Sequence, residues 1–185
     1  MIEIPNMVMI GGNSRNAGKT TLAGKIIKKL AVNHQVIALK VTSIRPGESE
    51  MHGDHSAELN SGFSILEELN SDSHKDTSAM LRAGASKVFY IRTIDECMEP
   101  AILQFLSDYN INQPIVCESR SLRRIVNPGL FIMMIRNNAE GKPKDIFSYI
   151  SHADHVFTFD NDILEVKSFV DKLNFLNGKF LTNNA

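Results

Sequence analysis

Residues 10–21 read Ile10-Gly11-Gly12-Asn13-Ser14-Arg15-Asn16-Ala17-Gly18-Lys19-Thr20-Thr21. A short apolar run, Met7–Ile10, precedes this stretch, and a segment with apolar residues at helical spacing follows it. Glycines allow a sharp turn in which consecutive N–H groups point inward, and the positive end of the following helix adds to their field. A strand, a glycine-containing loop ending in Gly-Lys-Thr and a helix together predict a phosphate-binding loop, or P-loop.

The residue types of this loop match the chemistry of a bound nucleotide. Lys19 supplies a point charge to the outer phosphates, and the Thr20 hydroxyl is placed to ligate Mg²⁺. The strict pattern requires its first glycine at Asn13, whereas the available Gly12 lies one residue earlier. Either Asn13 adopts the left-handed conformation that asparagine tolerates, or the loop is one residue longer. The predicted nucleotide contacts in the loop are Gly12, Asn13, Ser14, Arg15, Asn16, Ala17, Gly18, Lys19, Thr20 and Thr21.

Strands and helices alternate along the rest of the chain. After the first strand, buried strands are expected at Gln35–Val41, Lys87–Ile91, Pro114–Cys117, Leu130–Ile135 and, as the last, Val156–Phe159. Helical spacing covers Thr20–Ala31, Thr77–Ala83, Cys97–Tyr109 and, closing the chain, Asp162–Leu176. Apolar strands separated by amphipathic helices predict a three-layer α/β/α fold with a mainly parallel sheet. We expect Met7–Val41 to form a βαβ unit whose two strands are neighbours, and the 185 residues to form a single P-loop domain.

One polar segment, residues 42–75, interrupts this rhythm and is expected to be an insertion within the domain. A short hairpin strand is expected near Phe63–Leu66, and the segment has the length of a lid over a second substrate. The segment also carries side chains that can ligate zinc. The sequence leaves open whether they form a metal site or are solvated; they are His52, Asp54, His55 and His74.

Composition excludes several classes of protein. The 20 Lys+Arg residues balance 21 Asp+Glu, whereas nucleic-acid binding requires a basic footprint. The longest apolar run, Leu130–Ile135, is far below the ~20 residues that span a bilayer, so no membrane partner is expected. The N-terminus lacks the pattern of a secretory signal, and Cys97 and Cys117 are expected to be free thiols in the cytoplasm.

Three residues outside the loop are candidates for the same site. Glu118 follows an apolar strand and can hold the water shell of Mg²⁺, as P-loop proteins require of an acid at a neighbouring strand end. Lys40 is expected at the end of the second strand, where its charge would neutralise phosphate. Asn137 follows another strand, where its amide can pair with a purine base or simply form a turn. Arg15 and Asn16 can contact the nucleotide or, across a homodimer, a second copy of the chain.

These motifs occur in an order that resembles a known family. The P-loop, Lys40, the stretch Lys75–Ala85 (Lys-Asp-Thr-Ser-Ala-Met-Leu-Arg-Ala-Gly-Ala) and Glu118 follow one another as in MobB, the nucleotide-binding accessory protein of molybdopterin-guanine dinucleotide synthesis. The resemblance covers about two thirds of the chain. It implies that Lys19, Thr20 and Glu118 are the nucleotide and metal residues, with Lys19 and Glu118 also catalytic.

The resemblance also implies that Asp76 is a further catalytic residue, which positions a substrate or water, and that the chain binds and slowly hydrolyses GTP or ATP with Mg²⁺ for molybdenum-cofactor synthesis. Two departures, Val41 in place of histidine and Ser119 in place of glycine, leave the client open. The Gly12–Thr20 spacing is similar to that of dethiobiotin synthetase, which keeps a small-molecule kinase or ATP-dependent ligase as an alternative. A nucleotide-gated binding module without useful catalysis is a third.

Overall fold

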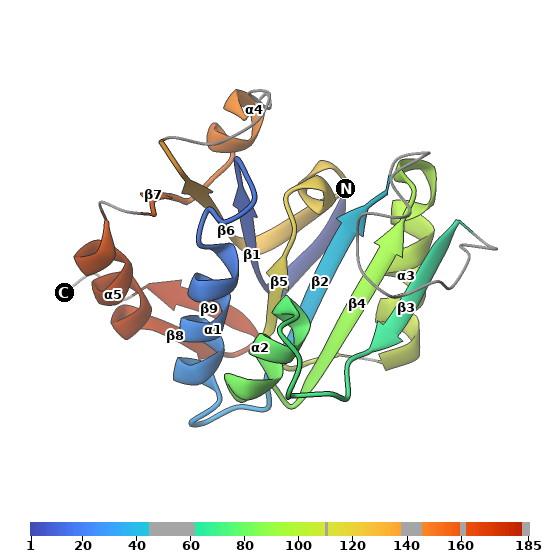
Figure 1. Ribbon diagram of the computed structural model, residues 1–185, viewed down its shortest axis with the longest axis horizontal. Coiled ribbons are helices and arrows are strands. Elements are labelled where there is room, and N and C mark those ends of the chain that lie inside the picture. The colour runs from blue at the N-terminus through green and yellow to red at the C-terminus, as the bar shows by residue number, and fades with distance from the viewer. Residues whose placement is uncertain (45–61, 110, 138–145, 160–161, 183–185) are drawn as a thin grey trace.

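The central feature of the computed structural model is a seven-stranded sheet with the order β3-β4-β2-β5-β1-β6-β7 (Figure 1). The structure describes residues 1–44, 62–109, 111–137, 146–159 and 162–182. All pairings in this sheet are parallel except that of β3 with β4. The strands are β1 (Ile2–Gly12), β2 (Ile37–Ser43), β3 (Phe63–Glu67), β4 (Lys87–Thr93), β5 (Ile115–Glu118), β6 (Val126–Ile135) and β7 (His155–Thr158).

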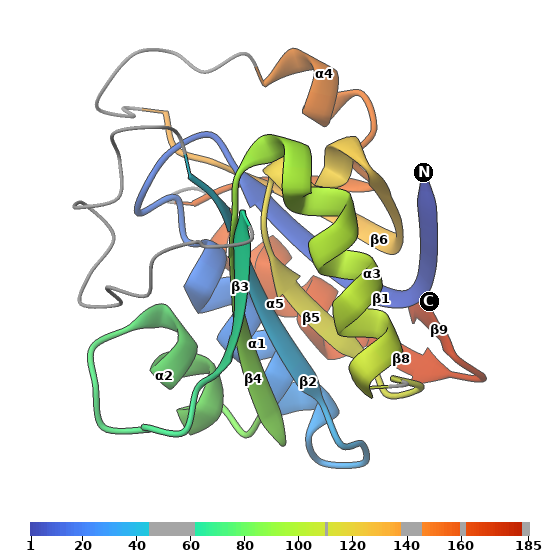
Figure 2. The same ribbon diagram turned by 90° about the vertical axis from the view of Figure 1, so that its right-hand side faces the viewer.

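Helices cover both faces of the sheet. They are α1 (Lys19–Leu30), α2 (Asp76–Arg82), α3 (Met98–Tyr109), α4 (Phe147–Ile150) and α5 (Ile163–Lys172), with short 3-10 turns η2 (Asp95–Cys97) and η3 (Ser121–Arg124). In Figure 2, which looks onto the β3 edge, α2 lies on one side of the sheet and α3 on the other. This is the predicted three-layer α/β/α fold.

The interior strand β1, which lies between β5 and β6, contributes to two hydrophobic cores. Val8 and Ile10 face the core beneath α1, α2 and α5, whereas Met7 and Met9 face the core beneath α3. All four side chains are fully buried, which explains why the strand reads as a continuous apolar run. The strand that leads into the phosphate loop is therefore held from both faces.

Helix α1 is formed by a sequence that places its apolar residues on one side. Its buried residues are Leu22, Ala23, Ile26, Ile27 and Leu30. Lys28 and Lys29 lie in the last turn, where positive charge interacts favourably with the helix dipole. The first turn holds no acidic residue, so its positive end remains available to an anion.

One expected neighbour relation is wrong. Strands β1 and β2 run parallel, as a βαβ unit requires, but β5 lies between them and pairs with both. A helical crossover can pass over an intervening strand, and the local sequence carries no information about how many strands it passes. The consequence is that Glu118, rather than Lys40, ends the strand beside β1, and Lys40 pairs in register with Glu118.

The end of the chain also differs from expectation. Helix α5 ends at Lys172, and β8 (Leu173–Leu176) and β9 (Lys179–Thr182) form an antiparallel hairpin after it. Leu173, Phe175 and Phe180 of this hairpin are buried in the α1 core. A helical spacing of apolar residues through Leu176 hid the hairpin, and β7 is consequently not the last strand. The short helix α4 was not expected either.

Parts of residues 42–75, the segment expected to be an insertion, belong to strands of the sheet. β2 continues to Ser43, and β3, near the expected Phe63–Leu66, pairs antiparallel with β4 at the sheet edge. Residues 45–61, which include His52, Asp54 and His55, lie outside the described residues. Within the described residues no helix has the length and apolar character needed to cross a membrane.

The core beneath α3 provides a test of the fold. Phe105 is fully buried and meets the Phe89 ring edge-on at 5.2 Å between centroids. We expect Phe105→Ala to lower the free energy of unfolding by about 3–5 kcal/mol, because it removes apolar contacts and leaves a cavity. Leu103→Ala on the same helix, at a side chain that is 50% exposed, should cost under about 1 kcal/mol. Urea unfolding of the two variants measures both, and equal losses would contradict this packing.

Candidate functional site

The phosphate loop connects β1 to α1 and contains two left-handed residues. Asn16 has a φ of 58° and Gly18 a φ of 84°. Alternation of right- and left-handed residues turns successive N–H groups toward a common centre, the geometry of an anion-binding nest. Among the described residues, no oxygen accepts a hydrogen bond from the backbone N–H groups of Arg15, Asn16 or Gly18. The loop thus presents backbone donors that an anion can satisfy.

Asn13 ties the start of this loop to the neighbouring strand. Its side-chain amide donates to the Arg136 carbonyl at 3.0 Å, and its side-chain oxygen accepts from the Arg136 N–H at 3.1 Å. The left-handed conformation considered for Asn13 occurs at Asn16 and Gly18 instead. Gly12 lies directly beneath the Lys19 stem, where an added Cβ would come within 2.9 Å of Lys19 Cδ. The loop that extends from Gly12 is therefore the longer of the two alternatives.

Lys19 extends back across the loop. Its ammonium donates to the Ser14 carbonyl at 2.8 Å, which places a positive charge over the turn that carries the N–H groups. Its stem packs over Gly12, so the position of the charge depends on the absence of a side chain there. A cation held at this point can meet the oxygens of an anion that enters the loop.

Thr20 and Glu118 meet at the edge of the loop. The Thr20 hydroxyl donates to Glu118 Oε2 at 2.8 Å, across 98 residues of sequence. Glu118 is only 6% exposed, and the pairing of β5 with β1 positions it. A hydroxyl and a carboxylate are hard oxygen ligands, which Mg²⁺ prefers, so this pair fits a magnesium ion.

A second pair of charges lies next to this one. The Lys40 ammonium forms an ion pair with the Asp76 carboxylate at the start of α2. Because Lys40 pairs in register with Glu118, its charge lies beside both carboxylates. The structure therefore groups Lys19, Thr20, Lys40, Asp76 and Glu118 at one edge of the sheet.

This grouping shifts two pKa values. Burial works to lower the pKa of Lys40, but the negative charges of Glu118 and Asp76 outweigh it and raise that pKa. Burial works to raise the pKa of Asp76, but the hydrogen bond and charge of Lys40 outweigh it and lower that pKa. Thr20 and Lys19 contribute further lowering at Asp76. Both groups are held in their charged forms.

The other expected site residues differ in how exposed they are. Ala17 is buried, whereas Arg15, Asn16 and Thr21 are exposed at the loop and the start of α1. Asn137 is exposed in the turn after β6. His74 is exposed before α2, and no group of three or more metal-ligating side chains occurs among the described residues.

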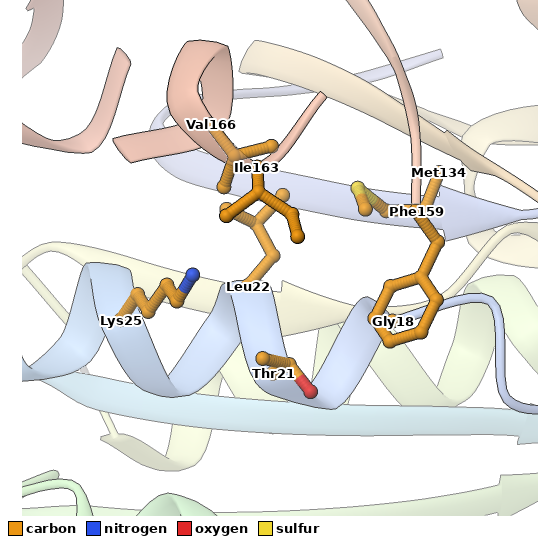
Figure 3. Close-up of a pocket in the computed structure, with 8 residues that line it drawn as sticks. All are labelled: Gly18, Thr21, Leu22, Lys25, Met134, Phe159, Ile163 and Val166. Carbon is orange, nitrogen blue, oxygen red and sulfur yellow. The ribbon is translucent and has the colours of Figure 1, made fainter. Parts of the chain in front are cut away.

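An apolar cavity of about 250 Å³ lies between α1 and α5 (Figure 3). In the strand order, Phe159 of this cavity follows β7 on one side of β1, and Glu118 ends β5 on the other side. The lining residues of the cavity are Gly18, Thr21, Leu22, Lys25, Met134, Phe159, Ile163 and Val166. The Phe159 ring lies against Gly18, where an added Cβ would come within 2.0 Å of it. Sequence reasoning missed Phe159, because an aromatic residue at a strand end reads as ordinary core.

Comparison with known proteins identifies the fold. No family model matches the chain, and no curated protein sequence matches it. A crystal structure of the apo form of LpxK from Aquifex aeolicus in complex with ATP is similar, with a TM-score of 0.52 and 15% sequence identity. The alignment covers 97% of this chain and 54% of that one. The chain has a P-loop NTPase fold.

At 15% identity this likeness concerns the fold, and the chain spans about half the length of LpxK. The resemblance to MobB rests on the order of the motifs alone.

The left-handed backbone at Gly18 generates a prediction about the loop. Gly18→Ala should lower the free energy of unfolding by at least about 1–2 kcal/mol, because it strains a positive φ and drives a methyl group into Phe159. Gly24→Ala is the matched control, since its Cβ would meet nothing closer than Ala83 at 3.8 Å. That substitution should stabilise the helix by about 0.5–1 kcal/mol. Thermal unfolding distinguishes the two, and equal effects would contradict the loop geometry.

The Lys40–Asp76 pair generates a prediction about pH. The pKa of Asp76 is lower in the folded protein than its ordinary value of 3.8. The ionised carboxylate therefore stabilises the fold at pH values above 3.8, and this stabilisation is lost as the pH falls from 3.8 through the pKa of the folded protein. Asp76→Asn should therefore be less stable than the wild type at pH 7, with a difference that shrinks below about pH 4. In a Lys40→Met background the same substitution should show little dependence on pH. Urea unfolding between pH 2.5 and 7 measures this, and an undiminished difference at pH 3 would exclude the ion pair as its cause.

Proposed function

We propose that this protein binds a purine nucleoside triphosphate with Mg²⁺ and transfers or releases its terminal phosphoryl group. The observation that carries the proposal is the contact of Thr20 with the buried Glu118 beside a loop of inward-turned N–H groups. Burying a carboxylate is costly unless charge or hydrogen bonds compensate, and here the Thr20 hydroxyl and the Lys40 charge hold Glu118 as a carboxylate at the loop. A magnesium ion held by Thr20 and Glu118 would neutralise charge on the outer phosphates.

The chain's own residues provide positioning and charge. The loop N–H groups hold the phosphate oxygens, and the Lys19 ammonium stabilises the negative charge that develops on the transferred group. Asp76, at the neighbouring helix, accepts a hydrogen bond from the attacking water or hydroxyl group. Its lowered pKa makes it a weak proton acceptor, so it orients the nucleophile more than it removes a proton. This combination supports slow hydrolysis in the absence of a better acceptor.

Two kinds of acceptor for the phosphoryl group are considered, water and a small molecule. The order of the P-loop, Lys40, the Lys75–Ala85 stretch and Glu118 supports a MobB-like accessory role in molybdenum-cofactor synthesis, with water as the acceptor. The Lys40–Asp76 pair beside Glu118 supports a small-molecule kinase or ATP-dependent ligase, because the Asp76 carboxylate can accept a hydrogen bond from the hydroxyl or amine of an acceptor. Phosphate release without any added acceptor favours the first, and acceptor-dependent turnover favours the second.

The test of nucleotide binding is Lys19→Ala. We expect calorimetric titration with MgATP or MgGTP to show binding weakened by about 100-fold or more, because charge-assisted contacts to the outer phosphates are lost. Circular dichroism should match the wild type and the cooperative unfolding transition should be kept, since Lys19 is half-buried and lies in neither core. Lys28→Ala removes an exposed lysine from the same helix and should bind as the wild type does.

Affinity of Lys19→Ala equal to that of the wild type would refute the site. Glu118→Gln then separates catalysis from binding alone. An enzyme should lose most of its phosphate release in this variant, whereas a nucleotide-gated binding module would show the same low background in both proteins.

A further inference from the structure

The apolar cavity between α1 and α5 has no part in the phosphate chemistry proposed above. It is nevertheless continuous with the phosphate loop, because Gly18 and Thr21 belong both to the loop region and to the cavity wall. Figure 3 shows the Phe159 ring over Gly18, with Ile163 and Val166 facing α1 from the other helix. A molecule whose anionic end enters the loop can therefore place its other end in this cavity.

The strand order sets the direction of such a molecule. Glu118 follows β5 on one side of β1, whereas Phe159 follows β7 on the other side. The metal ion in P-loop proteins bridges the two outer phosphates, so the terminal phosphate belongs on the Glu118 side. The inner phosphate and the nucleoside then point toward Thr21 and α5.

On this basis, and resting on the proposed function, we propose that the cavity takes the base of the bound nucleotide and that the base is adenine. A volume of about 250 Å³ lies below the roughly 300 Å³ at which pockets for drug-sized ligands begin, and it suits a single flat heterocycle. The Phe159 ring offers an aromatic wall, and Leu22, Ile163 and Val166 provide the aliphatic ones.

The polar groups of the lining select between the purines. The eight described lining residues include no carboxylate and no amide, and the side chains able to hydrogen-bond strongly are those of Thr21 and Lys25. Lys25 only donates, and both purines offer acceptors to it, so the choice between them depends on the N–H donors of the base. Guanine would bring three N–H hydrogens, at N1 and N2, against the two of the adenine amino group, and Thr21 is the single strong side-chain acceptor among the described lining residues. Unsatisfied donors are costly to bury, so guanine is disfavoured.

Calorimetric titrations with MgATP, MgGTP and magnesium tripolyphosphate test this inference on the full chain. Tripolyphosphate reports the phosphate loop alone, and the two nucleotides add the base. We expect ATP to bind at least about tenfold more tightly than GTP and than tripolyphosphate. Lys19→Ala should weaken all three, which shows that they share the loop.

Ile163→Trp fills the cavity from a position that is 61% exposed and therefore leaves the cores intact. It should weaken ATP at least about tenfold while tripolyphosphate binding stays unchanged. Leu164→Trp is the matched control, because Leu164 is the next residue on α5, is 81% exposed and does not line the cavity. That variant should bind ATP as the wild type does.

The outcomes separate the two proposals. If GTP binds as tightly as ATP or more tightly, or if Ile163→Trp leaves ATP affinity unchanged, the base site is overturned while the phosphate site stands. If neither tripolyphosphate nor ATP binds, or if Lys19→Ala has no effect, the proposed function fails and the base site fails with it.

Discussion

The sharp bend between β1 and α1 is the constraint on which the rest of the site depends. Two residues within three positions, Asn16 and Gly18, adopt left-handed backbone conformations that cost energy in most sequences. They persist because both ends of the bend are fixed. β1 is buried on both faces, and α1 packs its apolar side into one of the two cores. The hydrogen bonds between Asn13 and Arg136 tie the loop to β6 as well.

The position of every other site residue follows from that bend and from the strand order. β5 pairs with β1, so Glu118 ends beside the first turn of α1 and accepts from Thr20. β2 pairs with β5 in turn, and this brings Lys40 into register with Glu118. Asp76 enters from α2 and completes an arrangement in which cations and carboxylates alternate. Such a crevice keeps its charged groups charged, as the pKa shifts of Lys40 and Asp76 show.

The two sides of the loop differ in chemistry. On the β5 side lie the carboxylates, the paired lysine and a hydroxyl, which suit a metal ion and outer phosphates. On the β7 side lies an apolar cavity bounded by Phe159, which suits a heterocycle. In the proposed function, the loop would bind the triphosphate, while residues on neighbouring elements would select what is attached at either end. The similarity to LpxK at 15% identity concerns the fold.

Much of this could be predicted from the residues themselves. The apolar run Met7–Ile10, the loop through Thr21 and the periodic α1 determine a strand–loop–helix unit, because each depends on local backbone preferences and on spacing. Glu118 was recognisable for a similar reason, as an acid at the end of an apolar run. The helical spacing through Leu176, by contrast, concealed a hairpin, because apolar residues in an isolated segment fit either structure until the surface they pack against is known.

The tertiary structure alone decided which strands are neighbours and what fills the space beside the loop. The insertion of β5 between β1 and β2, the pairing of Lys40 with Asp76 and the cavity under Phe159 each involve residues tens of positions apart. Sequence carries no direct record of such distances, because side-chain spacing reports the face of an element and not its partner. The order of the sheet is set by how all the elements bury their apolar faces together, and that is a property of the whole chain.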